Sequence, residues 1–131
     1  MNDLLLIAAD DEERRLLFAE LREAGYPVLP VPGLGYAMRM LSLRAVAPSL
    51  ILLDAHDDPF ARPVHVGRLA ALASGTPVIL VVGAIGMAWW EPLRPKLAAL
   101  LGRPIRIGEI VDAVRKILPR KQAKLPGQDV T

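Results

Sequence analysis

Short runs of consecutive apolar residues recur along this chain, and segments with helical spacing separate them. Runs of this length that are apolar throughout, without polar alternation, are typical of strands covered on both faces of a parallel sheet. The strand-like runs are residues 4–9, 26–31, 49–53 and 78–82.

The intervening segments predict helices. Asp10 or Asp11 is placed to cap the first helix, and Gly25 is placed to end it. Leu17 and Leu21 lie on its apolar stripe. Further helices are predicted over residues 33–44, 64–73 and 110–118.

The run over residues 26–31 predicts an edge strand, because it contains Pro27 and Pro30. Proline has no N–H to donate to a neighbouring strand and is largely confined to edge strands or strand ends. The two prolines are three positions apart, so their missing donors point in opposite directions. One of them must therefore lie beyond the paired region or at a bulge.

The stretch after Gly86 allows two interpretations. Residues 89–92 can finish one helix, with residues 97–101 as a short last strand. Equally, Pro92 can start a helix that ends at Gly102, since leucine and alanine favour helix over strand. We favour the strand, because the alternating architecture needs it.

This alternation of strands and helices predicts an α/β fold with right-handed crossovers. We expect a flavodoxin-like, doubly wound sheet of five parallel strands in the order 2-1-3-4-5, with helices on both faces. The length suits one domain, which we place at residues 1–118, followed by a disordered basic and polar tail at residues 119–131.

Acidic residues close two of the strand-like runs. Asp54 follows the run over residues 49–53, and Asp10 and Asp11 follow the run over residues 4–9. In this strand order the carboxyl ends of the first and third strands flank the crevice where ligands bind. Such carboxylates suit a hard divalent cation or a nucleophile toward phosphorus. The alternative is a helix cap and a solvated strand end, and spacing alone leaves both open.

Composition narrows the function classes. The net charge is +2, and the basic residues gather late in the chain with few aromatic residues near them, so nucleic-acid binding is not expected. The sequence lacks cysteine, which suits a cytoplasmic protein. No apolar run approaches the ~20 residues of a membrane helix, and the start of the sequence does not have the pattern of a signal peptide.

Four segments together resemble the receiver domains of two-component response regulators, over residues 4 to 118. They read "AADDEERRLL", "SLILLDAHDDP", "TPVILVVGA" and "GRPIRIGEIVDAVRKIL". The resemblance implies that Asp54 accepts a phosphoryl group from a histidine kinase. It also implies that magnesium is held by Asp10, Asp11, Asp54 and the backbone carbonyl of His56.

Three positions depart from the family pattern. Val82 stands where the family has a serine or threonine hydroxyl, Arg103 stands where it has a lysine before a proline, and Leu100 stands where it has an aromatic switch residue. Valine offers no hydrogen bond, and an arginine fork differs from an ammonium in shape and reach. These departures indicate a degenerate receiver in which magnesium binding is weak and phosphorylation at Asp54 switches weakly or not at all.

Two further groups of residues allow a functional interpretation and a structural one. His56 and His65 are nine positions apart, and we expect their imidazoles to be surface groups and not metal ligands. Met87, Trp89 and Trp90 either divide between core and surface or form an anchor for a partner. In receivers the fourth helix, last strand and last helix form the output and dimerisation face, so a homodimer there is one expectation.

The sequence therefore favours a stand-alone, atypical receiver that acts by protein–protein contact and is not an enzyme. A competent magnesium-dependent phosphoacceptor remains an alternative. So does a module of the same fold that binds a small anion or nucleotide through Arg103. A phosphotransfer enzyme built on Asp54 is discouraged, because its only nearby acid–base candidates are His56, Asp57 and Asp58 in a loop.

Overall fold

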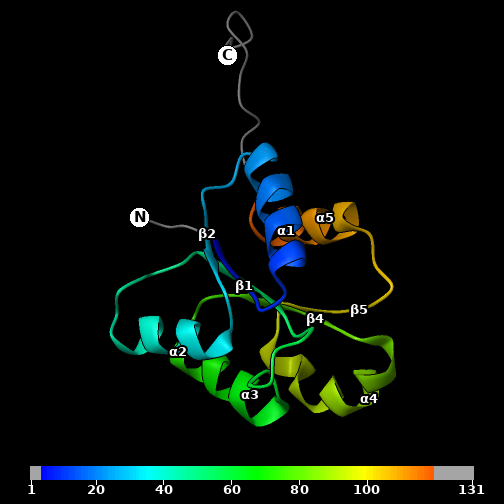
Figure 1. The fold of residues 1–131 in the computed structure, drawn as a ribbon. Helices are drawn as coiled ribbons and strands as arrows, with labels where there is room; N and C mark the ends of the chain where they lie inside the picture. The colour runs from blue at the N-terminus through cyan, green and yellow to red at the C-terminus, as the bar shows by residue number, and fades with distance from the viewer. Residues whose placement is uncertain (1–3, 120–131) are drawn as a thin grey trace, which may run out of the picture.

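The computed structural model describes residues 4–119, in which five parallel strands form one sheet in the order β2-β1-β3-β4-β5 (Figure 1). This confirms the predicted fold. Of the predicted tail, residues 120–131 lie outside the described residues. The strands are β1 (Leu4–Ala8), β2 (Val28–Val31), β3 (Leu50–Asp54), β4 (Val78–Val82) and β5 (Ala99–Gly102).

Helices cover both faces of the sheet, as Figure 1 shows. One face carries α1 (Asp11–Glu23) and α5 (Ile107–Ile117). The other carries α2 (Leu34–Ser42), α3 (Pro63–Leu72) and α4 (Met87–Trp90). No helix of the described residues is long and apolar enough to cross a membrane.

Side chains that alternate along the strands divide the core into two layers. Leu4 and Leu6 of β1 pack in the layer beneath α1 and α5, whereas Leu5 and Ile7 pack in the layer beneath α2 and α3. Every residue of β1, β3 and β4 is buried. This burial on both faces explains why the three central strands are apolar without alternation.

The edge strand β2 accommodates both prolines as expected. Pro27 lies just before the strand, where its carbonyl accepts a hydrogen bond from the Leu4 amide at 2.9 Å. Pro30 lies within β2, level with Leu6 of β1. The strand is exposed in part, and among residues 4–119 its only neighbour in the sheet is β1.

The segment between β4 and β5 is not one continuous helix. It forms a 3₁₀ turn (Ala84–Gly86), the short α4 and a second 3₁₀ segment (Glu91–Lys96) before β5. Pro92 and Pro95 explain the break, because each lacks the N–H that an α-helical ladder needs. The last strand is confirmed, and the alternative helix from Pro92 to Gly102 is wrong.

Candidate functional site

Asp54 ends β3 and is the one buried charged side chain among residues 4–119, at 1% exposure. In the sheet it is level with Ala8 of β1 and Val81 of β4. The small side chain of Ala8 brings no polar group to this position. Within the sheet, the neighbours of Asp54 at the carboxyl ends of the strands are therefore apolar.

Both carboxylate oxygens of Asp54 accept hydrogen bonds. The guanidinium of Arg103 donates to Oδ2 at 2.5 Å, and the backbone amide of His56 donates to Oδ1 at 3.0 Å. Burial raises the pKa of the Asp54 carboxyl above its ordinary value. The His56 amide and Arg103 lower that pKa, the charge of Glu13 raises it further, and the net shift is upward. The carboxyl is held in place by its donors but is costly to ionise.

Arg103 follows β5, and its backbone amide donates to the Val82 carbonyl at 2.8 Å. Its guanidinium also contacts Glu13 of α1, at 3.3 Å from Oε2. The side chains of Arg103 and Glu13 are about three-quarters buried, at 24% and 28% exposure. A single arginine thus joins the strand-end carboxylate to the first turn of α1.

The acidic pair after β1 has other partners. Asp10 caps α1, and its Oδ1 accepts from the amides of Glu12 and Glu13 at 2.9 and 3.2 Å. Asp11 is the first residue of α1 and pairs with Arg14, with its own side chain 76% exposed. The carboxylates of Asp10 and Asp11 therefore contact different groups from those that contact Asp54.

The contacts of Asp54 affect whether it can bind magnesium, because a magnesium ion needs oxygen ligands that are free to coordinate it. At Asp54 one oxygen faces an amide and the other faces the guanidinium of Arg103. While Arg103 donates to Asp54, the groups around this carboxylate do not fit a metal ion. The role of Asp10, Asp11, Asp54 and the His56 carbonyl in holding magnesium stays a prediction.

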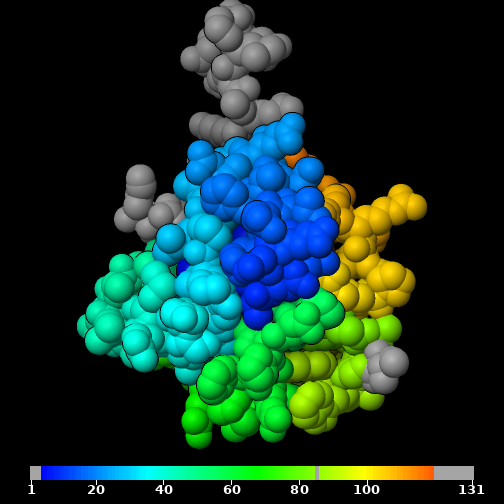
Figure 2. Space-filling view, viewed as in Figure 1, coloured from blue at the N-terminus to red at the C-terminus, as the bar shows by residue number. Residues whose placement is uncertain are grey.

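The loop after β3 brings an imidazole to the acidic residue that caps α1. Nε2 of His56 lies 3.7 Å from Oδ2 of Asp10 and 3.4 Å from Oδ2 of Asp57. Figure 2 shows this green loop directly against the dark blue start of α1. His56 therefore does cluster with acidic residues, which its sequence spacing from His65 did not indicate. His65 lies against the ring of Phe60 instead, with the ring centres 6.2 Å apart.

The three residues that depart from the receiver pattern lie at or near the ends of the last two strands, as the sequence predicts. Val82 ends β4 and is 1% exposed. Leu100 lies in β5, pairs with Leu80 and is 7% exposed. Both side chains are core residues without polar atoms, and Arg103 is the one departure whose side chain reaches Asp54.

The group considered as a partner anchor, Met87, Trp89 and Trp90, is partly in the core and partly on the surface. Trp90 is 4% exposed and packs in the core, and its ring centre is 5.5 Å from that of Trp89. Met87 lies over Gly102, where a Cβ on the glycine would collide with the methionine's terminal methyl. Trp89 is 59% exposed. Of the three residues, Trp89 alone presents most of its side chain to solvent.

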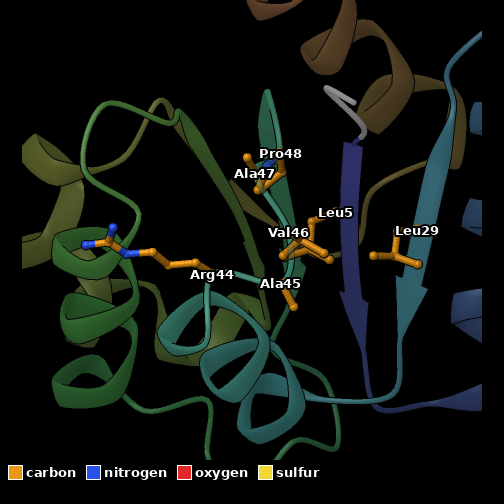
Figure 3. Close-up of a pocket in the computed structure, with 7 residues that line it drawn as sticks. All are labelled: Leu5, Leu29, Arg44, Ala45, Val46, Ala47 and Pro48. Carbon is orange, nitrogen blue, oxygen red and sulfur yellow. The ribbon is translucent and has the colours of Figure 1, made fainter.

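A cavity of about 360 Å³ lies at the opposite end of the sheet (Figure 3). It is formed by Leu5, Leu29 and the segment 44–48 that leads into β3. The side chain of Arg44 extends away from Leu5 and Leu29 in Figure 3. Apart from Arg44, the side chains of the residues that line this cavity are apolar.

Sequence reasoning missed Glu13 as a member of this region, and it named Asp57 only as a loop residue near Asp54 without its contact to His56. The signal for Glu13 was its place three residues after the cap Asp10, since a side chain at that helix position turns back toward the preceding strand end. Asp57 adopts the left-handed backbone conformation, with φ of 57°. Aspartate tolerates that conformation better than most residues, but its sequence neighbours do not predict it.

Comparisons with solved structures agree with the fold. A response regulator receiver domain protein from Clostridium thermocellum has a TM-score of 0.76 and 13% identity, covering 92% of this chain and 97% of that one. A response regulator receiver protein from Burkholderia phymatum has a TM-score of 0.73 and 20% identity, covering 93% and 98%. A structure described as adenylate cyclase from Rhodopirellula baltica has a TM-score of 0.76 and 17% identity, covering 90% and 88%.

The chain therefore has the fold of receiver domains. No family model matches the sequence, and no curated protein matches it. Because one fold hosts many functions, the activity has to be argued from the site.

Proposed function

We propose that this chain is an atypical response-regulator receiver domain, active in the cytoplasm through protein–protein contact. In this proposal phosphorylation at Asp54 produces weak switching or none. Its partners are a histidine kinase or another signalling protein, and it is not an enzyme. The observation that carries the proposal is the ion pair between Asp54 and Arg103.

That ion pair opposes phosphorylation at its first step. A phosphoryl group on Oδ2 of Asp54 would take the position where Arg103 now donates. A magnesium ion beside the same oxygen would be repelled by the guanidinium unless Arg103 moved away. Arg103 is also held by Glu13, so its movement would break two charged contacts.

The conformational response to a phosphoryl group on Asp54 is weakened as well. Val82 supplies no hydroxyl for a phosphoryl oxygen, and a hydrogen bond to a charged group contributes roughly 1.5–3 kcal/mol. Coupling between two sites in a protein is typically ~1–3 kcal/mol. Loss of this one contact therefore removes an energy comparable to the whole coupling. Leu100, buried in β5, has no polar tip that could report the change at the surface.

The same contacts argue against a small-anion module. A guanidinium that already faces two carboxylates, those of Asp54 and Glu13, has little positive potential left for an anionic ligand. A competent phosphoacceptor remains the alternative to test, because Asp54 itself is present at the end of β3.

The test uses amide spectra of the ¹⁵N-labelled protein with magnesium and beryllofluoride, a mimic of the phosphoryl group. We expect small shifts in the wild-type protein. Val82→Thr together with Arg103→Lys should enlarge the shifts in β4 and β5, because the pair restores a hydroxyl and a compact ammonium. Asp54→Asn is the matched control and should abolish any shift that depends on the acceptor.

Large shifts along β4 and β5 in the wild-type protein, absent from Asp54→Asn, would show a working switch and overturn the proposal. Acetyl phosphate provides a second readout by intact mass. Efficient, magnesium-dependent gain of a phosphoryl group at Asp54 of the wild type would contradict the blocking role of Arg103.

A further inference from the structure

We propose that Asp10, His56 and Asp57 form a binding site for a divalent transition-metal ion of the zinc type. This site differs from the magnesium site that the resemblance implies, because its central ligand is an imidazole and it does not use Asp54. The inference does not depend on the proposed function.

The spacing of the three side chains suits such an ion. In a tetrahedral zinc site the ligand atoms lie about 2.0–2.2 Å from the metal, which places neighbouring ligand atoms about 3.3–3.6 Å apart. Nε2 of His56 is 3.4 Å from Oδ2 of Asp57 and 3.7 Å from Oδ2 of Asp10. All three ligand atoms lie within 4.8 Å of one another. Small rotations of exposed side chains would complete the geometry.

The backbone around the site is fixed by contacts outside it. Asp10 uses Oδ1 to cap α1, which leaves Oδ2 directed at His56. The amide of His56 is held by Asp54. Asp58 ties the same loop to α2, since its Oδ2 accepts from the Leu34 amide at 2.8 Å. The loop that carries two of the ligands is therefore attached to both β3 and α2 before any ion binds.

The chemistry of the donors selects the ion. One imidazole nitrogen and two carboxylate oxygens suit zinc, cobalt or nickel, whereas magnesium prefers an all-oxygen set that includes water. The two carboxylates supply the negative charge that favours a dication. The side chains of His56 and Asp57 are exposed, at 49% and 68%, so water can complete the coordination and the ion can enter from solvent.

The competing explanation is that His56 and the two aspartates form ordinary surface ion pairs. The chain offers a matched control, because His65 is the only other histidine. Titration of the full chain with zinc chloride should bind one zinc per chain and perturb the side-chain nitrogen signals of His56 but not those of His65. His56→Gln and Asp57→Asn should each weaken zinc binding at least about tenfold. His65→Gln should leave it unchanged.

Magnesium in large excess should not displace the zinc. The inference fails if zinc does not bind, if His56→Gln binds zinc as the wild type does, or if His65→Gln weakens binding equally. It fails too if the His56 nitrogen signals do not move on zinc addition. Thermal unfolding of each variant without metal checks that the fold is intact.

Discussion

Replacing Arg103 by methionine should leave a carboxylate buried at the end of β3 without its guanidinium partner. Removing one partner of a buried ion pair costs about 3–5 kcal/mol. Arg103 is 24% exposed and is shared with Glu13, so we expect a loss of about 2–3 kcal/mol at neutral pH. In a domain of this size that corresponds to a fall in Tm of roughly 6–12 °C.

The loss should depend on pH in a defined direction. Burial raises the pKa of Asp54 above 3.8, so its contribution favours folding below that value and is lost as pH rises through the folded-state pKa. Arg103 lowers the folded-state pKa, and removing it moves that pKa further up. The variant should therefore be only slightly less stable than the wild type near about pH 4 and much less stable at about pH 7.5.

Urea unfolding followed by tryptophan fluorescence provides the assay, because Trp90 is buried in the folded state and exposed on unfolding. Asp54→Asn and the double variant with Arg103→Met complete a double-mutant cycle. At neutral pH the double variant should be more stable than Arg103→Met alone, because it buries no unpaired charge. A destabilisation by Arg103→Met that is the same at both pH values, or a double variant without recovery, would refute the reasoning.

Two other substitutions test separate parts of the molecule. Tyr26→Phe should lower the free energy of unfolding by about 1 kcal/mol, because the Tyr26 hydroxyl donates to the Leu118 carbonyl at 2.7 Å; unchanged urea unfolding would contradict this. Trp89→Ala should leave stability within about 0.5 kcal/mol but weaken self-association or partner binding in sedimentation experiments. Tyr36→Ala, which removes a similarly exposed aromatic side chain from α2, is the control, and equal effects of both would remove the case for Trp89 as an anchor.

The central strands could be predicted because strands that are buried on both faces have continuous apolar sequences. The last strand could not be predicted in this way. Its leucine and alanine residues favour helix, and it is extended because it pairs with β4, as in the match of Leu100 with Leu80. The segment after β4 is divided into short helical pieces because Pro92 and Pro95 cannot donate backbone hydrogen bonds, and this outweighs the helical spacing of its apolar residues.

The candidate site was predictable only in part, for a related reason. Asp54 is found from its strand alone, since its position follows from the end of an apolar run. Its ion pair joins it to Arg103, 49 positions away in the sequence, and no local pattern predicts that contact. The clustering of His56 with Asp10 likewise joins two segments that are far apart in the sequence, and Asp58 anchors the loop that carries His56.

Pro30 in β2 has a consequence for crowded or partly unfolded states of the protein. An open sheet edge offers a row of backbone donors and acceptors to which a strand of another molecule can add. In β2 that row is interrupted at Pro30, which has no N–H to offer. Successive addition of strands, as in amyloid, is therefore disfavoured at this edge of each copy.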